Sequence, residues 1–273
     1  MKKLFIVIIL LSFSFYYTNK VVDILKNTDP IMKEIKNTKD KYKINPINAE
    51  IINDNIIPGV FGKEIDYDKS YHQMKRYGTY NESLTVIKDT KPVISIEDNY
   101  DKYIIKGNNK SNNISLVFID NNPNRIMNIL DNKKVSGTFF IDGTILEKNY
   151  NLFKSTTHEI ELLSYNNSYQ KEFFKTSLSF LESITKEKPM YCYTEEDNND
   201  LLKLCSKYKL HTIKPTLIIE KDLYKQLKNN VKSSYIITIK MNNYMEDDLK
   251  VGIDYLKKKG FNIVNLRTLL QEN

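Results

Sequence analysis

Glycine is scarce in this sequence, with 8 residues among 273. Loops that cradle phosphate groups need several glycines, and the chain contains neither a G-x-x-x-x-G-K-[ST] nor a G-x-G-x-x-G motif. The G-x-S-x-G turn of the α/β-hydrolases is also absent. These absences argue against a P-loop nucleotidase, a dinucleotide-binding domain and a serine esterase.

Cysteine and histidine are scarce as well, with two and three residues. Two cysteines are too few for a disulfide framework and lack the spacing of a metal cluster. We expect Cys192 and Cys205 to be buried free thiols, with a bridge in an oxidising compartment as the alternative. A nucleophilic role for Cys192 would require a nearby histidine, and none is expected there.

The charged residues give a net charge of +7, which favours polyanionic surroundings such as acidic wall polymers or anionic lipid. The lysines are scattered, however, and aromatic residues do not alternate with them along a stripe. This distribution is typical of a solvated basic surface and predicts no nucleic-acid partner.

The first residues combine positive charge with a long apolar run. Lys2 and Lys3 precede LFIVIILLSFSFYY, and no further charge appears before Lys20. We predict that residues 1–20 form an uncleaved membrane anchor or signal segment, with the rest of the chain on the extracytoplasmic face of the cell membrane. Secretion after cleavage is the alternative.

Three segments follow this terminus. Residues 21–43 are rich in Lys, Asn and Asp and predict a stalk. Residues 44–111 contain turn signals and short apolar stretches, which predict a small leader or cap segment. Residues 112–273 predict the main domain.

The main domain alternates apolar runs with amphipathic segments. The predicted strands are 114–119, 137–143, 158–164, 190–194, 211–219, 234–241 and 261–266, and helices are predicted between them, including 144–155. This alternation predicts an α/β fold whose parallel strands form a barrel. Functional residues then belong at the carboxyl ends of the strands.

Several stretches of this domain resemble the polysaccharide deacetylases, the NodB homology domain of carbohydrate esterase family 4. ISLVFIDNNPNRIMNILDNKKVSGTFFIDG resembles the family's opening TFDDGP and ATFF segments, and THEIELLSYNN resembles its GHEIGNHTYSH segment. KPMYCYTEEDNNDLLKLCSKYKLHTI and SSYIITIKM resemble two later segments. Residues 44–84 also resemble a leader found before some membrane-anchored bacterial deacetylases. The resemblance implies a distorted (β/α) barrel.

The family's chemistry uses a divalent metal, usually zinc, bound by one Asp and two His. A second Asp acts as the base, an Arg holds that base, and a His on a late strand protonates the leaving amine. Asp120 matches the metal-binding Asp, whereas Ile119 stands where the family has its base. The remaining family positions are occupied by Leu163 and Asn167 in place of the two His, by Tyr193 in place of the Arg, and by Lys240 in place of the late His. These replacements predict that no metal is bound and that no catalytic residue set is intact.

Few other residues could replace the missing ligands. We expect His72, His158 and His211 to be structural, with His211 at the opposite end of the barrel. Glu195, Glu196 and Asp197 could bind a hard cation such as calcium, but the following Asn198 and Asn199 favour a capped helix start. We expect Lys240 to form an ion pair with Asp120 across the cleft.

The sequence therefore predicts a catalytically degenerate, deacetylase-like protein of the cell envelope that binds wall polysaccharide or an envelope protein. The alternative is an active metal-dependent de-N-acetylase with altered ligands. Tyr165, Tyr191 and Tyr193 could stack on sugar rings at the cleft mouth, although core packing explains tyrosines equally well.

Overall fold

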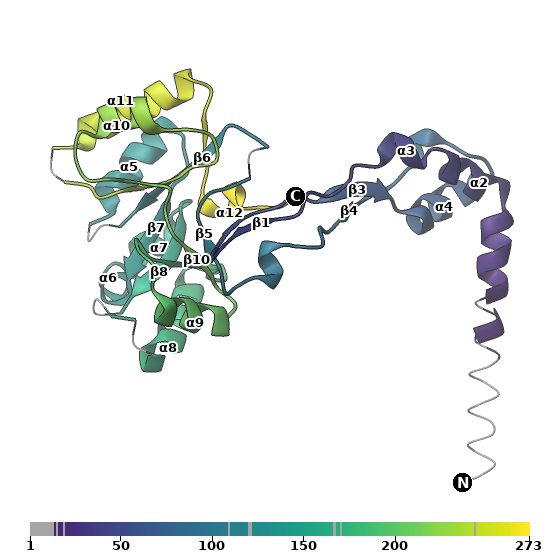
Figure 1. The fold of residues 1–273 in the computed structure, drawn as a ribbon, viewed down its shortest axis with the longest axis horizontal. Coiled ribbons are helices and arrows are strands. Elements are labelled where there is room, and N and C mark those ends of the chain that lie inside the picture. Colours follow the sequence, from purple (N-terminus) through teal and green to yellow (C-terminus); the bar gives the residue numbers. More distant parts are fainter. Residues whose placement is uncertain are drawn as a thin grey trace, which may run out of the picture. The chain divides into compact units, whose positions relative to one another are not determined.

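The computed structural model describes residues 14, 16–18, 20–108, 110–119, 122–165, 168–169, 171–242 and 244–273. The chain divides into two compact units, one of residues 1–46 and 61–91 and the other of residues 47–60 and 92–273 (Figure 1). The predicted leader segment, 44–111, contributes residues to both units.

The smaller unit combines short helices with a two-stranded sheet. Its elements are α2 (Pro30–Asn37), α3 (Lys39–Tyr42), β3 (Gly62–Ile65), α4 (Tyr67–Lys75), η1 (Glu82–Leu84) and β4 (Ile87–Thr90). Asp29 caps α2 by accepting a hydrogen bond from the amide of Ile31, and Pro30 occupies the first turn. The buried side chains of Ile31, Ile35, Ile65 and Met74 form the core of this unit.

The described residues between positions 14 and 28 are helical. No helix in the described part of the chain combines the length and apolar character needed to cross a membrane. The predicted anchor, residues 1–20, lies mostly outside the described residues.

The larger unit alternates strands and helices. It contains β1 (Glu50–Ile52), β2 (Asn55–Ile57), η2 (Ile96–Asp98), β5 (Tyr103–Ile104), β6 (Asn113–Phe118), α5 (Asn124–Lys133), β7 (Thr138–Asp142), α6 (Gly143–Lys148), α7 (Tyr150–Ser155), β8 (Glu159–Ser164), α8 (Lys171–Thr185), β9 (Tyr191–Tyr193), α9 (Asn199–Lys207), β10 (His211–Ile213), β11 (Leu217–Ile219), α10 (Leu223–Asn230), β12 (Ile236–Ile239), α11 (Glu246–Lys258), β13 (Asn262–Ile263) and α12 (Leu266–Leu269). Helices α10 and α11 pack together, and α11 also packs on α5 (Figure 1).

The strands of this unit form two sheets. One has the order β11-β12-β6-β7-β8, with β13 beside β6, and the other has the order β1-β2-β5-β10-β9. All the pairings are parallel except that between β1 and β2. The prediction of an α/β fold with parallel sheets is therefore confirmed.

Side chains alternate between two hydrophobic layers along the central strands. Leu116, Phe139 and Ile237 belong to a cluster shared with the helices, whereas Val117 and Phe140 belong to a second cluster. We call this second group the inner cluster; it consists of Ala49, Ile56, Ile96, Ile104, Val117, Phe140, Tyr191, Tyr193, Ile213, Ile236, Leu266, Leu269 and Leu270. Period-two alternation thus assigns one face of each strand to the inner cluster and the other face to the helices.

Two predicted elements are divided in the structure. The predicted strand 211–219 forms β10 and β11, which belong to different sheets. Pro215 lies between them and has no amide hydrogen for a strand ladder, which favours the break at this point. The predicted helix 144–155 likewise forms α6 and α7, which meet at Asn149.

The prediction of free thiols is wrong, because Cys192 and Cys205 form a disulfide with their Cα atoms 6.4 Å apart. Tyr191 and Tyr193 point into the inner cluster, so Cys192 points from the other face of β9 toward the helices. Cys205 lies on the buried face of α9. Helix α9 packs on β10, the strand that pairs with β9. This arrangement brings the two thiols together across 13 residues of sequence.

Candidate functional site

The residues at the family's catalytic positions lie at the carboxyl ends of four strands. Ile119 follows β6, and Leu163 is the penultimate residue of β8. Tyr193 ends β9, and Lys240 follows β12. Strands β12, β6, β7 and β8 pair in parallel, which brings their carboxyl ends to one edge. Asp120 and Asn167, the two other predicted site residues, lie outside the described residues.

Apolar contacts dominate this edge. Tyr193 belongs to the inner cluster, and the half-buried side chains of Ile119 and Leu163 pack against the same cluster. The three positions at which the family has a base, a metal ligand and an arginine are thus occupied here by side chains that pack in one hydrophobic cluster. The inner cluster extends to the edge where the family has its polar groups.

Tyr193 is held by the strands around it. Its hydroxyl donates to Thr238 Oγ1 at 3.0 Å, and its ring lies 5.2 Å from that of Phe140, centroid to centroid. Its carbonyl oxygen accepts a hydrogen bond from the hydroxyl of Tyr169 at 3.2 Å. Burial raises the pKa of the Tyr193 hydroxyl above its usual range, so this phenol stays neutral and serves packing.

Lys240 contacts two carboxylates, Glu195 after β9 and Glu220 after β11, which belong to different sheets. Its Nζ atom lies 2.8 Å from Glu195 Oε2 and 2.9 Å from Glu220 Oε1. Hydrogen bonds to Glu195 and Glu220 raise the pKa of the Lys240 ammonium, and Lys240 lowers the pKa of Glu220. The Lys240 ammonium is therefore ion-paired with these two acids. The predicted ion pair with Asp120 is not tested, because Asp120 lies outside the described residues.

The acidic loop after β9 starts a helix. Asn198 caps α9 by accepting a hydrogen bond from the amide of Leu201 at 3.0 Å. Asp197 pairs with Lys214 at 2.7 Å, and Glu195 pairs with Lys240. The prediction of a capped helix start is confirmed.

The residues present do not fit the family's zinc. Leu163 and Tyr193 supply no nitrogen or carboxylate ligand, and within the described residues no three His, Cys, Asp or Glu side chains gather around a point that could hold a metal ion. Asp120 and Asn167 would add one carboxylate and one amide, whereas zinc sites use three or four strong ligands. We therefore derive no step through a metal.

Two of the three histidines belong to the larger unit and lie away from this edge. His158 immediately precedes β8 and His211 opens β10, so both are at the amino ends of their strands. His72 belongs to α4 of the smaller unit. The structural roles predicted for His158 and His211 agree with their burial.

The three candidate tyrosines differ in exposure. Tyr191 and Tyr193 are only 2% and 3% exposed, so their rings have no surface to offer a sugar, and core packing accounts for them. Tyr165 is half-buried, stacks on Phe173 with ring centroids 5.7 Å apart, and its hydroxyl donates to Glu147 Oε1 at 3.3 Å.

Tyr165 also lines a small apolar cavity of about 170 Å³, together with Gly143, Glu147, Phe173, Thr176, Ser177 and Phe180. A Cβ atom at Gly143 would lie 2.5 Å from the Tyr165 ring, so only glycine leaves room for the ring in this position. Of the three tyrosines, Tyr165 remains the candidate for contact with a ligand.

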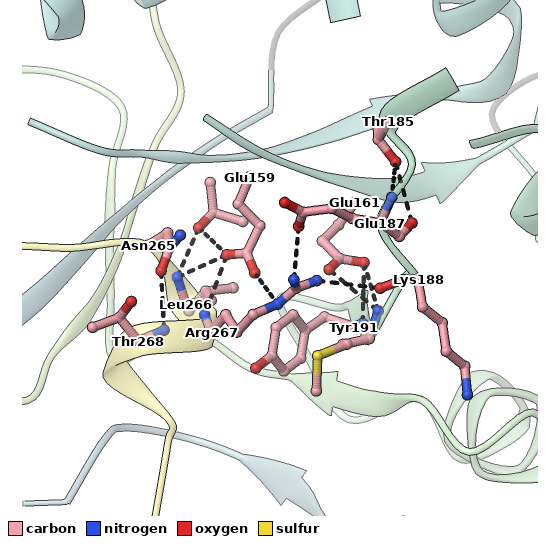
Figure 2. A network of polar contacts seen from close by, with 12 residues as sticks. Glu159, Glu161, Thr185, Glu187, Lys188, Tyr191, Asn265, Leu266, Arg267 and Thr268 are labelled. Atoms are coloured by element: carbon pink, nitrogen blue, oxygen red, sulfur yellow. Dashed lines mark hydrogen bonds and ion pairs between the residues drawn. The ribbon is translucent and has the colours of Figure 1, made fainter. Parts of the chain in front are cut away.

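Sequence reasoning missed two buried acids on β8. Glu159 and Glu161 are 5% and 1% exposed (Figure 2). They alternate along β8 with Ile160 and Leu162, whose side chains pack toward the helices. Both oxygens of Glu161 accept hydrogen bonds from the amide of Met190, at 3.0 and 3.2 Å, and one also accepts from the amide of Tyr191 at 3.2 Å. The carboxylate thus joins β8 to the start of β9, two strands that do not pair within the described part of the chain.

Glu159 joins β8 to α12 in the same way. Its Oε2 atom accepts from the Thr138 hydroxyl at 2.7 Å and from the amide of Leu266 at 2.8 Å, while its Oε1 atom lies 3.7 Å from Arg267 Nε (Figure 2). The signal available in the sequence was the alternation of acidic and apolar residues in EIEL, inside the predicted strand 158–164.

These features define a domain with the fold of the NodB-type polysaccharide deacetylases, as three similarities bear out. The crystal structure of BA3943, a carbohydrate esterase family 4 pseudoenzyme from Bacillus anthracis, matches with a TM-score of 0.66 at 20% identity, over 90% of this chain and 96% of that one. A mutant of that protein, described as having restored enzymatic activity, matches with the same TM-score at 21% identity, over 89% of this chain and 99% of that one. A mutant of the peptidoglycan deacetylase PdaC from Bacillus subtilis matches with a TM-score of 0.51 at 17% identity, over 59% of this chain and 90% of that one.

Among curated proteins, the uncharacterized protein YlxY of Bacillus subtilis strain 168 is 29% identical over 155 residues. The match covers 53% of this chain and 48% of YlxY, so the chain spans about half the length of this relative. No protein-family model matches the chain.

Proposed function

We propose that this protein is a catalytically degenerate, polysaccharide deacetylase-like protein of the cell envelope that binds wall glycan or an envelope protein. The observation that supports this most is the packing of Ile119, Leu163 and Tyr193 against the inner cluster. A base, a ligand and an arginine would each need a polar environment and access to substrate at these positions. The similar BA3943 structure is itself described as that of a pseudoenzyme.

The proposed location is the extracytoplasmic face of the cell membrane, with secretion as the alternative. The apolar N-terminal run after Lys2 and Lys3 supports export. The Cys192–Cys205 disulfide supports it independently, because disulfides persist in oxidising compartments and are rare in the cytosol.

An active de-N-acetylase with altered ligands is the competing function. It would need a bound divalent metal and a group able to take a proton from water. The fold alone supports this function, and a fold does not determine an activity.

Binding of wall glycan is tested by co-sedimentation of the purified full chain with insoluble peptidoglycan. We expect saturable retention that falls several-fold in Tyr165→Ala, because this half-buried ring lines the apolar cavity and can stack on a sugar. Tyr150→Ala is the matched control, since Tyr150 is 45% exposed on α7 and does not line this cavity. Absence of retention would exclude the glycan ligand and leave an envelope protein as the proposed partner. Equal loss in the two variants would remove Tyr165 from the site.

A further inference from the structure

A second cavity, of about 200 Å³, lies at the amino ends of β9 and β10. It is lined by Tyr100, Lys188, Pro189, Met190, Lys209, His211 and Arg267. Met190 immediately precedes β9, and His211 is the first residue of β10. The cavity is therefore at the opposite end of these strands from Tyr193 and the candidate functional site.

Three cationic side chains surround this cavity. Lys188 and Lys209 are exposed, and within the described residues neither ammonium forms an ion pair. This distinguishes them from Lys214 and Lys240, whose ammonium groups are paired with acids. The third cation, Arg267, is half-buried.

Arg267 is held in place by its surroundings. Its Nη1 atom donates to Glu187 Oε2 at 2.7 Å and its Nη2 atom to the Lys188 carbonyl at 3.2 Å (Figure 2). A guanidinium carries five N–H donors, so these two bonds leave donors for a further acceptor. The acids near Arg267 are Glu187 and the buried Glu159 and Glu161. Burial raises the pKa of both buried acids and favours their neutral forms, so with the two lysines the lining keeps a net positive charge.

His211 contributes an imidazole to the wall of the cavity. It is 3% exposed, and its Nδ1 atom has no hydrogen-bond partner among the described residues. The Tyr100 ring stacks on its imidazole with centroids 4.4 Å apart, which fixes the orientation of the ring at the cavity wall. Burial lowers the pKa of His211 to about 4, so at neutral pH the imidazole is uncharged and offers one N–H donor.

We propose that this cavity is a binding site for a phosphate group, with Lys188, Lys209 and Arg267 neutralising its charge and His211 donating a hydrogen bond. Compact ammonium groups and a guanidinium are the side chains that bind phosphate oxygens in proteins. The phosphate could be free or part of a phosphodiester polymer, and both sources present the same oxygens to the cavity.

The test is a titration of the full chain followed by ³¹P NMR, in 0.15 M salt. Diffuse attraction to a basic surface is largely screened there beyond about 8 Å. The probes are inorganic phosphate, glycerol 1-phosphate and a glycerol-phosphate oligomer. Acetate, which carries no phosphorus, is added as a carboxylate competitor, and its affinity is read from the displacement of bound phosphate. We expect saturable binding of phosphate, and the oligomer arm shows whether a phosphodiester is also accepted.

Two double variants give the proposal its control. Lys188→Gln with Lys209→Gln is expected to weaken phosphate binding at least ten-fold, and both side chains are exposed, so the fold should survive. Lys175→Gln with Lys225→Gln removes the same charge from exposed positions on α8 and α10 and is expected to change binding less than two-fold. In the wild-type chain, phosphate should also shift the imidazole ¹⁵N signals of His211.

Four results would overturn the proposal. These are the absence of saturable phosphate binding, equal weakening in the two double variants, acetate binding as tight as that of phosphate, and phosphate binding that leaves the His211 signals unmoved. None of these results bears on the candidate functional site at the other end of the strands, so the two proposals stand or fall separately.

Discussion

At the residue scale, the two buried acids of β8 are the least expected feature of the molecule. A carboxylate removed from water is costly unless it is hydrogen-bonded. Glu161 meets this requirement with the amides of Met190 and Tyr191, and Glu159 meets it with Thr138 and Leu266. Each acid substitutes for backbone pairing at a place where two elements meet without a strand ladder.

Glu161→Gln tests the electrostatic cost of this arrangement. Burial, and secondarily the charge of Glu159, raises the pKa of Glu161 well above its ordinary value. A raised pKa contributes stability that is fully present below the ordinary pKa and is lost as pH rises through the raised one. We therefore expect the wild type to lose stability to urea more steeply than Glu161→Gln as the pH rises above the ordinary range of a glutamate carboxyl, because the glutamine stays neutral and retains an acceptor oxygen.

The control for this comparison is Glu172→Gln, an exposed acid in the first turn of α8. Its pH profile should parallel that of the wild type. Identical slopes for the wild type and Glu161→Gln would mean that Glu161 does not titrate in this range. Glu161→Leu should have a lower free energy of unfolding than both the wild type and Glu161→Gln, because two buried amide donors would lose their acceptor at about 1–3 kcal/mol each.

Lys240 shows the limit of residue-scale prediction. Its position at the strand end followed from the alternation of elements, and the resemblance assigned it to the late histidine. Its contacts with Glu195 and Glu220 depend on which loop acids approach within about 3 Å, and these acids come from loops after two other strands. The periodicity of apolar residues predicts where strands and helices begin and end. It does not predict which acidic side chains come within hydrogen-bonding distance of Lys240.

At the element scale, the long amphipathic segments were predictable and the short strands were not. Helices α9 and α11 carry apolar residues at helical spacing over 9 and 13 residues, which is a strong signal. Strands β10 and β11 have three residues each and read as one apolar run. Pro215 favours a break between them, but the pairing of β10 with β9 and of β11 with β12 is not encoded in the run itself.

The disulfide fixes one such element, since it links β9 to the last turn of α9. The bridge closes a short loop of sequence separation 13, for which loss of chain entropy in the unfolded state corresponds to about 3 kcal/mol. We expect Cys205→Ser to lower the free energy of unfolding by about this amount, measured by urea denaturation under non-reducing conditions.

Reductant provides the matched control for this prediction. It should destabilise the wild type to a similar extent and leave Cys205→Ser unchanged. If mass spectrometry after thiol alkylation found two free thiols in protein isolated from its native compartment, the bridge and its support for export would both be refuted.

At the scale of the whole molecule, the parallel architecture was predictable because strands and helices alternate from residue 113 onward. The contribution of β1, β2 and β5 was not, since these strands have two or three residues and come from a segment with turn signals. Strand β5 pairs with β10, more than one hundred residues later in the chain. Pairing at such separation depends on the assembled core rather than on local pattern.

The candidate site was predictable in position and partly in character. The resemblance located Leu163, Tyr193 and Lys240 at the strand ends, and the residue types alone excluded the family's zinc ligands there. The extension of the inner cluster to this edge required the structure, because Ile119 and Leu163 are half-buried residues whose packing partners come from other strands. The burial of Tyr191 and Tyr193 likewise depended on which face of β9 turns inward.

The proposed function depends most on the absence of metal-dependent deacetylase activity at this edge of the fold. The most direct test purifies the full chain without chelators, offers it zinc, cobalt and nickel, and measures bound metal by mass spectrometry and acetate released from N-acetylglucosamine polymers. We predict far less than one metal ion per chain and no acetate above the level without protein. One tightly bound metal per chain, with acetate release that Asp120→Ala abolishes, would contradict the account and establish the de-N-acetylase instead.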